Sequence, residues 1–455
     1  MKEKRQSFLK GAIIISAGGF ISKILGAVYR IPLTNFLGGG GMGVYQMVYP
    51  LYCILLTVSA SGIPSGIARL KASGKSEGVE LSAFRFYGLV GLIGTLAMFL
   101  LAEPLAAIQG EASVALCCKL LCPSVFFVSL LSVVRGYFQG LGNMYPTAVT
   151  EVAEQLIKVA FGCVFAYLLR DNPALAVAST LFAVTLSEAF STIVAAVWYR
   201  KKKPRAPLYR LPSPPVSAIL KYTVPLTLTA IALPLSQLAE SVIAVRLLRE
   251  ITTDATALYG IFSGCAVTII NLPVSVTYGL AASAVPQISP LAESGDFPAA
   301  RKKAFKALLI TLAVSLPMAI VLYAFAPLAA KIIFGSLKER ELETLIRLVR
   351  IMAACSVTQS LVQTSSACLT ALGRPALSTV TQWLSSFLRV GICALLIKFT
   401  PLSVDGAGVA ANCAFLVASA MNFWYIIRAG GKDENNADRF GNFGRRFNFA
   451  RKGGA

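Results

Sequence analysis

Charged side chains lie inside long apolar segments of this sequence, and they are the residues best suited to bind a charged group. Lys23 and Arg30 stand seven residues apart in the apolar segment 11–37, so they share one face of a helix. At 1.5 Å per residue, Lys23 lies roughly 18 Å from the start of that segment, near the centre of a bilayer. A cation at that depth costs about 2.5–3.5 kcal/mol, so we expect Lys23 to line a polar cavity. Arg30 lies near the opposite surface, where an interfacial anchor is the alternative role.

Carboxylates accompany these cations in other segments. Glu151, Glu154 and Lys158 occupy positions i, i+3 and i+7 of segment 146–169 and therefore share a face. Glu154 and Lys158 have the favourable i, i+4 order, and mutual neutralisation is the alternative to a binding role. Glu188 and Glu240 each have two candidate roles, as the partner of a cation or as the carrier of a coupling proton or sodium ion.

Arg389 differs from these residues because no carboxylate lies near it in its own segment, 376–399. It therefore needs a partner from another helix or an anionic ligand. Cations closer to segment ends, such as Lys119 and Arg135, are expected to extend toward the membrane surface and contact lipid headgroups.

The composition requires a membrane. Of the 455 residues, 56% are hydrophobic and 14% are charged, whereas soluble domains carry about 25% charged residues. Apolar runs of about 20 residues recur along the chain, and each is long enough to cross the hydrocarbon layer as a helix. The net charge of +21 does not indicate nucleic-acid binding, because the basic residues gather in short loops and are not interleaved with aromatics. The sequence thus predicts an all-α integral membrane protein.

Enzymatic chemistry finds little support in the sequence. There are ten cysteines and no histidine, and the cysteines lack the spacing of metal ligands. Neither a phosphate-binding loop nor a GxSxG motif is present. We therefore expect no enzyme activity, no metal and no cofactor, with transport driven by an ion gradient, the membrane potential or downhill substrate flow. H⁺ and Na⁺ are the candidate coupling ions.

Twelve membrane-spanning helices are predicted. They fall at 11–37, 44–69, 84–108, 112–137, 146–169, 174–199, 218–245, 257–284, 304–334, 342–372, 376–399 and 405–428. Basic residues concentrate in alternate loops, including 200–210 and 301–306, so the positive-inside rule places those loops and both termini in the cytoplasm. We expect the protein to lie in the cell membrane.

The chain divides into two predicted lobes of six helices. Residues 1–200 form the first lobe, 201–217 a basic cytoplasmic linker, 218–429 the second lobe and 430–455 a polar, basic cytoplasmic tail. A shift of 231 residues aligns LGNMYPTAVTEVAEQLIKV, starting at Leu141, with LGRPALSTVTQWLSSFLRV, starting at Leu372. An even number of helices in each lobe predicts a pseudo-twofold axis along the membrane normal, with a cavity between the lobes.

Three segments resemble a known superfamily: SKILGAVYRIPLTNFLG, RGYFQGLGNMYPTAVTEVAEQLIKV and YGIFSGCAVTIINLPVSVTYGLAASAVPQIS. They are similar to the multidrug/oligosaccharidyl-lipid/polysaccharide exporters, in the branch of stage V sporulation protein B and lipid II flippases. The resemblance implies a V-shaped pair of lobes that exports an undecaprenyl-pyrophosphate-linked sugar, plausibly the peptidoglycan precursor lipid II, by alternating access. It also implies that Lys23 and Arg30 bind the headgroup. Lys158 and Arg389 are candidates for further headgroup cations because of their depth in their own segments, and not because of the resemblance. Members of this branch usually have about fourteen helices, of which the last two help to form a groove for the lipid tail, so twelve predicted helices depart from the pattern.

Two other functions stay open. A cation-coupled multidrug exporter would use an acidic cavity built from Glu151, Glu154, Glu188 and Glu240. A non-transporting scaffold for cell-wall or spore-wall assembly would need none of the internal charges. The expected partners are a lipid-linked oligosaccharide, membrane lipids and proteins of cell-wall synthesis, and nucleic acid is not among them.

Overall fold

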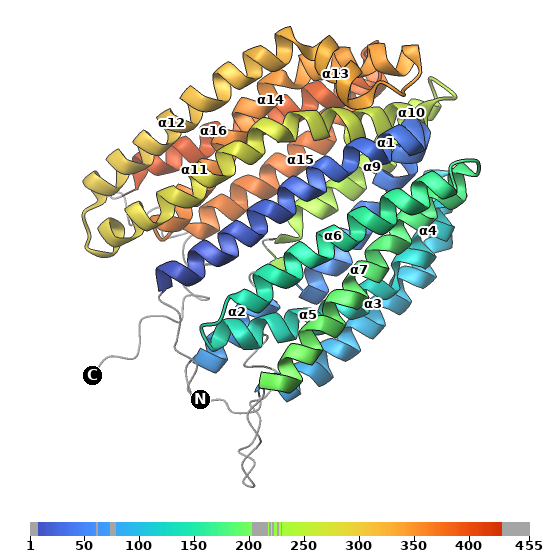
Figure 1. Cartoon of the computed structure of the whole chain (residues 1–455). Coiled ribbons are helices and arrows are strands. Elements are labelled where there is room, and N and C mark those ends of the chain that lie inside the picture. The colour runs from blue at the N-terminus through green and yellow to red at the C-terminus, as the bar shows by residue number, and fades with distance from the viewer. Residues whose placement is uncertain are drawn as a thin grey trace. The chain divides into compact units, whose positions relative to one another are not determined.

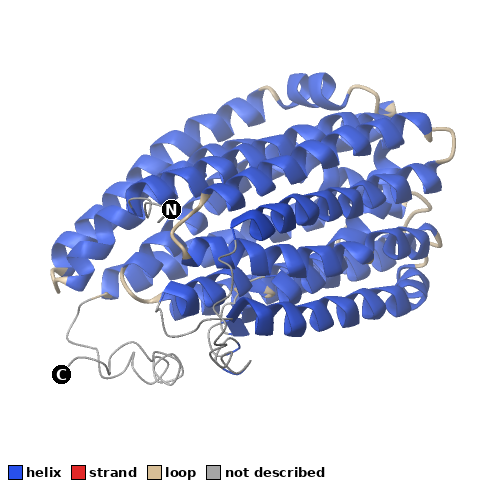
Figure 2. Cartoon of the chain, turned by 60° about the horizontal axis from the view of Figure 1, so that its bottom comes forward, coloured by secondary structure: helices blue, strands red, loops and turns tan. Residues whose placement is uncertain are grey.

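The computed structural model is helical throughout the part that it describes, and Figures 1 and 2 show helices joined by short loops. The described residues are 8–60, 62–72, 79–202 and 230–429, together with 217, 220, 223, 224, 227 and 228. The predicted tail 430–455 and most of the predicted linker 201–217 therefore lie outside the described residues.

Two compact units can be distinguished from the contacts within the chain. Unit 1 comprises Met1–Cys265 and Phe334–Glu341, and unit 2 comprises Ala266–Ile333 and Leu342–Ala455. The helices of unit 1 are α1 (Phe8–Ala60), α2 (Ile63–Ala72), α3 (Val79–Gln109), α4 (Ser113–Leu121), α5 (Pro123–Gly140), α6 (Tyr145–Leu168), α7 (Pro173–Lys202), α9 (Ala232–Arg249), α10 (Ala255–Gly260) and most of the π-helix η1 (Ile261–Ala266). The helices of unit 2 are α11 (Val267–Glu293), α12 (Phe297–Ala324), nearly all of α13 (Ala326–Phe334) and of α14 (Glu339–Ala371), α15 (Pro375–Phe399) and α16 (Asp405–Arg428).

These units do not have the boundaries of the predicted lobes, because α9 and α10 pack against α1 within unit 1. The sequence placed residues 232–260 in the second lobe because they follow the basic linker 201–217 and because of the internal repeat. The division into lobes at 201–217 stays a prediction.

The described part contains nine helical stretches that are long and apolar enough to cross a membrane. They are Ala17–Ser59, Glu80–Gln109, Ser113–Gly140, Pro173–Lys201, Ala255–Glu293, Phe297–Ala324, Glu339–Ala371, Pro375–Phe399 and Asp405–Arg428. The prediction of an all-helical membrane protein is confirmed. The count of twelve spanning helices stays a prediction. α6 and α9 each carry three charged residues, so neither is among the nine stretches that are apolar enough to cross a membrane.

Gly38 interrupts α1, the longest helix. Its φ of 66° and ψ of −176° lie outside the helical region, and a positive φ of this size favours glycine. Arg30 interacts electrostatically with Tyr45, although the two residues would be about 22 Å apart along a straight helix. The two halves of α1 therefore lie alongside each other, as expected for the separate predicted segments 11–37 and 44–69.

The first half of α1 packs closely against α6 through small residues. A Cβ added at Gly18 would lie 2.8 Å from the Cβ of Ala148, and one added at Gly26 would lie 3.5 Å from Oε1 of Gln155. At Gly162 of α6, an added Cβ would collide with the Tyr29 ring of α1. Glycine and alanine let two membrane helices approach closely, which brings the charged positions of α1 and α6 near each other.

The predicted repeat has a local counterpart in each unit. A left-handed glycine lies two residues after the end of α5 and two residues after the end of α14. These glycines are Gly142 and Gly373, and both have φ of 77°. In the first turn Asn143 N–H donates to Phe138 O at 3.0 Å, and in the second Arg374 N–H donates to Leu369 O at 2.9 Å. These are the bonds of a Schellman ending, and in both cases a proline follows at the start of the next helix.

This turn leads to the first prediction. Gly373→Ala should lower the thermal stability of the purified protein by about 1–2 kcal/mol, because alanine must adopt a left-handed conformation there. A Cβ at Gly373 meets no atom within 4 Å, so the backbone alone causes the loss.

Gly391 provides the matched control, since it is exposed within α15 and a Cβ there also meets nothing within 4 Å. Gly391→Ala should leave the melting temperature equal or higher, because alanine favours the helix. Equal destabilisation by both substitutions, measured by intrinsic fluorescence during heating, would contradict the role assigned to the turn.

Candidate functional site

An ion pair joins α5 and α6 inside unit 1. Nη2 of Arg135 lies 3.2 Å from Oε2 of Glu154, and Nε of Arg135 donates to Oγ1 of Thr150 at 3.0 Å. The Arg135 side chain is only 12% exposed. The prediction that Arg135 extends toward lipid headgroups is therefore wrong, because the guanidinium turns inward to a carboxylate on the next helix.

Glu188 of α7 is the second carboxylate of this region. It is 2% exposed, and its Oε1 accepts a hydrogen bond of 3.3 Å from the Tyr52 hydroxyl of α1. Its Oε2 is buried without a hydrogen-bond partner among the described residues. Glu154, Arg135 and Lys158 all interact electrostatically with this carboxylate. One oxygen of Glu188 is thus available to a proton, a cation or a ligand donor.

Lys158 of α6 lies close to the ion pair and to Glu188. It is 9% exposed, and its electrostatic neighbours are Glu154, Glu188, Arg30 and Cys53. Glu154 is paired with Arg135 and is also the strongest charge influence on Lys158, so it serves two cations. Mutual neutralisation of Glu154 and Lys158 stays an alternative to a binding role.

The structure therefore brings together five charged residues from four helix segments. We call Arg30, Arg135, Glu154, Lys158 and Glu188 the charge cluster. Three of its members are cations and two are carboxylates, which leaves one net positive charge if all are ionised. A low local dielectric strengthens every one of these interactions and makes an unbalanced charge costly without a ligand.

Three tyrosines of the second half of α1 border the charge cluster. Tyr45 and Tyr49 stack with ring centroids 5.4 Å apart, and Tyr52 follows at 5.7 Å from Tyr49. Tyr45 and Tyr49 lie near Arg30, and Tyr49 and Tyr52 lie near Glu154. Sequence reasoning missed these residues, although their spacing of i, i+4 and i+7 in YQMVYPLY places them on one helix face.

The remaining predicted site residues occupy other positions. Lys23 lies in α1, but its side chain is outside the described residues. Glu151 is half-buried on α6, where a Cβ at Gly19 of α1 would lie 3.9 Å from its Oε2. Glu240 is buried in α9, a helix that contributes no member to the charge cluster.

Arg389 belongs to unit 2 and is half-buried on α15. Its guanidinium carbon lies 6.0 Å from the centroid of the Phe415 ring on α16, at the outer limit of a cation–π contact. The partner expected from another helix thus includes an aromatic ring.

Metal binding has no support in the part of the chain that the structure describes, where no group of three His, Cys, Asp or Glu could hold an ion. The chemistry that the charge cluster offers is the binding of an anion by ammonium and guanidinium groups, next to carboxylates that can exchange a proton.

Comparisons with known proteins add the following findings. A family model described as "Polysaccharide biosynthesis protein" matches residues 8–291, and one described as "MatE" matches residues 225–395. The chain is 25% identical over 425 residues to "Stage V sporulation protein B" of Bacillus subtilis (strain 168), covering 89% of this chain and 81% of that protein. It is 22% identical over 458 residues to "Lipid II flippase MurJ" of the same organism, covering 93% of this chain and 83% of that protein.

Similarity in structure extends over nearly the whole chain. A solved structure described as "Inward-facing conformation of a multidrug resistance MATE family transporter of the MOP superfamily" matches with a TM-score of 0.78 and 18% sequence identity. The match covers 92% of this chain and 98% of that chain. The fold is accordingly MATE-like.

The second prediction concerns the buried ion pair. Arg135→Gln should destabilise the purified protein by about 3–5 kcal/mol, because it removes the ion-pair partner of a carboxylate whose side chain is only 17% exposed. The double variant with Glu154→Gln should recover part of this loss, which a double-mutant cycle of melting temperatures would measure.

Lys119→Gln is the matched control. It breaks the pair with Glu103, whose side chains are 36% and 68% exposed, and such pairs contribute about 0–1 kcal/mol. A loss at Lys119 as large as that at Arg135 would contradict the importance given to burial.

Proposed function

Because the chain belongs to the polysaccharide biosynthesis protein family, and with its MATE-like fold to the MOP superfamily of membrane transporters rather than to the enzymes, we propose that it is a flippase for a lipid-linked sugar. The substrate class is an undecaprenyl-pyrophosphate-linked sugar, such as lipid II or a related polysaccharide intermediate. One relative is named a lipid II flippase, which supports lipid II as the first candidate, and another is named a stage V sporulation protein.

The charge cluster is the observation that carries this proposal. Arg30 of α1 and Lys158 of α6 lie near each other, and Lys158 is buried. We propose that these two cations bind a pyrophosphate, which offers several charged oxygens. Lys23 lies seven residues before Arg30 on α1 and is a further candidate for headgroup binding.

The tyrosines beside the charge cluster suit the remaining parts of such a substrate. Hydroxyl groups can bond sugar hydroxyls, and the faces of Tyr45 and Tyr49 offer apolar area to a sugar ring or an isoprenoid chain. We assign Arg389 of unit 2 to the same substrate, as a cation for the headgroup or the sugar.

Coupling is proposed to occur at the carboxylates. The unpartnered Oε2 of Glu188 makes this residue the first candidate to carry a proton or sodium ion, and Glu151, Glu154 and Glu240 are further candidates. We retain the arrangement of twelve helices in two lobes, with both termini in the cytoplasm and alternating access to a central cavity, as part of the proposal.

A cation-coupled multidrug exporter is the second candidate, and the similarity in fold to a multidrug resistance transporter favours it. An organic cation would need unpaired carboxylates, but Glu154 is paired with Arg135, and Lys158 interacts with both cluster carboxylates. A scaffold without transport is the least consistent with the structure, since burying Lys158 and Glu188 costs stability that such a role does not require.

The third prediction tests the substrate class. Lipid II and undecaprenyl pyrophosphate should raise the melting temperature of the detergent-purified chain, whereas ethidium should not. Lys158→Gln should weaken this effect by roughly tenfold in apparent affinity or more, as expected for loss of a charge-assisted bond of about 1.5–3 kcal/mol.

Lys398→Gln is the matched control, because it removes one exposed cation near the end of α15. Unchanged lipid binding in Lys158→Gln, Arg30→Gln and Arg389→Gln together would sink the proposal. Stabilisation by ethidium alone would assign the protein to the drug exporters.

The fourth prediction separates coupling from binding. In proteoliposomes that contain lipid II, Glu188→Gln should abolish the dependence of flipping on an imposed pH or sodium gradient, because a glutamine cannot exchange the ion. Its binding of undecaprenyl pyrophosphate should stay within about threefold of the parent, which is less than 1 kcal/mol. Gradient dependence that persists in this variant would exclude Glu188 as the coupling residue.

A further inference from the structure

One face of α12 changes from cationic to apolar along its length. Lys302 and Lys306 are exposed on this face, and Leu309, Leu316 and Ile320 continue it at helical spacing. Leu309 is 66% exposed and Ile320 is 61% exposed. An apolar stripe of this kind matches hydrocarbon in a membrane-spanning helix, so the change at Lys306 marks the height where hydrocarbon gives way to headgroups.

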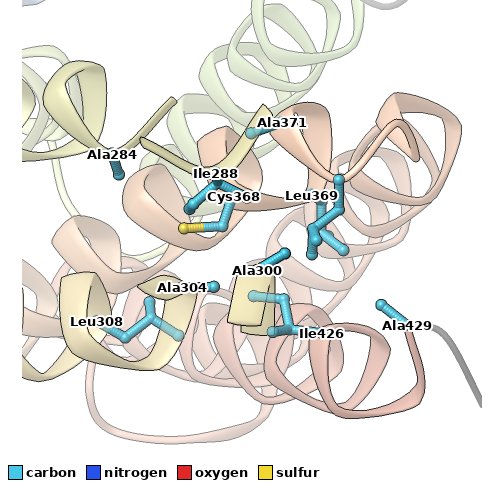
Figure 3. Packing of buried hydrophobic residues seen from close by; sticks show 11 residues of the cluster. Ala284, Ile288, Ala300, Ala304, Leu308, Cys368, Leu369, Ala371, Ile426 and Ala429 are labelled. Atoms are coloured by element: carbon cyan, nitrogen blue, oxygen red, sulfur yellow. The ribbon is translucent and has the colours of Figure 1, made fainter. Parts of the chain in front are cut away.

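The opposite face of α12 fixes this orientation. Ala300, Ala304 and Leu308 are buried in a cluster with Ile426 and Ala429 at the end of α16 (Figure 3). A rotation of α12 that hid the lysines would expose this packed face to lipid, so the lysines are held outward by the core of unit 2.

The end of α16 lies beside these lysines. Nη1 of Arg301 donates to the carbonyl oxygen of Ile427 at 2.9 Å, and the rings of Phe305 and Phe423 meet edge to face at 5.3 Å. The two helix ends are thus joined by a polar and an aromatic contact. Arg301 is held by its hydrogen bond to Ile427, whereas Lys302 and Lys306 are exposed and point away from the packed face.

α16 adds an aromatic–cation pair at the same end of unit 2. The guanidinium of Arg428 lies over the Trp424 ring at 4.1 Å from its centroid, and both residues are exposed. Tryptophan is enriched where hydrocarbon meets headgroups, and a guanidinium beside it can bind a phosphate.

We propose that Lys302, Lys303 and Lys306 of α12, together with Trp424 and Arg428 of α16, bind the phosphate of an anionic phospholipid. We call this surface the headgroup site. Lys302 and Lys306 lie one helical turn apart, with Cβ atoms about 5–6 Å from each other, so one phosphate can contact both ammonium groups. The acyl chains then run along Leu309 and Leu316, in register with the exposed apolar face.

The headgroup site is separate from the residues proposed to bind the transport substrate, because its members lie in unit 2, the charge cluster lies in unit 1, and Arg389 is not among its residues. A basic surface that only faces water would attract any soluble polyanion equally well. The apolar stripe that follows the lysines along α12 and the exposed Trp424 favour a lipid over a soluble polyanion. A lipid carries both a phosphate and a hydrocarbon chain, and a soluble polyanion carries no hydrocarbon chain.

Binding of phosphatidylglycerol and phosphatidylcholine to the full-length chain in neutral detergent, measured by native mass spectrometry, tests the proposal. The parent should retain phosphatidylglycerol in preference to phosphatidylcholine. The double variant Lys302→Gln, Lys306→Gln should bind phosphatidylglycerol roughly tenfold more weakly or worse, since each cation near a charged headgroup contributes to binding.

Lys331→Gln, Lys398→Gln is the matched control, since it removes two exposed lysines from the opposite end of the helices of unit 2. It should keep the parent's affinity, and Lys158→Gln should as well, which separates the headgroup site from the charge cluster. Equal loss in the two double variants would overturn the proposal, as would displacement of phosphatidylglycerol by millimolar inorganic phosphate or polyphosphate.

Discussion

The ion pair of Arg135 and Glu154 determines what the rest of the charge cluster can do. It holds a guanidinium and a carboxylate against each other beside Lys158 and Glu188, whose side chains are buried. The hydrogen bond from Arg135 to Thr150 adds a second link between α5 and α6, so the pair is held by two helices at once. Burial makes this arrangement costly to disturb, and it gives the remaining cations a fixed environment in which to meet an anion.

Close packing delivers these charges to one place. Gly18, Gly26 and Gly162 allow α1 and α6 to approach until side chains of one helix touch the backbone of the other. Without such contacts, Arg30 of α1 and Lys158 of α6 would be separated by a layer of larger side chains. Small side chains allow close packing in unit 2 as well. There Ala300 and Ala304 bring α12 against α16, and the opposite face of α12 is left to contact the membrane.

Much of the fold follows from the sequence, because helix length, apolar content and glycine placement are local properties. The offset of 231 residues aligned Gly142 with Gly373, where the structure has the same left-handed conformation, and Gly38 falls between two predicted segments. The membership of the charge cluster was only partly predictable. The depth of Lys158 and Glu188 along their helices suggested that they have a functional role. The same criterion predicted that the Arg135 side chain extends toward the membrane surface, which is wrong. The position of a residue in its own helix does not reveal a partner on another helix. The role of the tyrosines could not be predicted from the sequence. Aromatic residues on a buried helix face and those on a binding face recur at the same spacing along the chain.

The turn at Gly38 has a consequence for how the protein enters the membrane. Arg30 in the first half of α1 finds Tyr45 and Tyr49 in the second half, fewer than twenty residues later in the chain. An arginine that entered the bilayer alone would carry the full insertion cost until α5, α6 and α7 were synthesised. When the two halves insert together as a hairpin, hydroxyl groups accompany the guanidinium from the start. The short glycine link thus allows a cation to be placed in the membrane before any of its carboxylate neighbours exists.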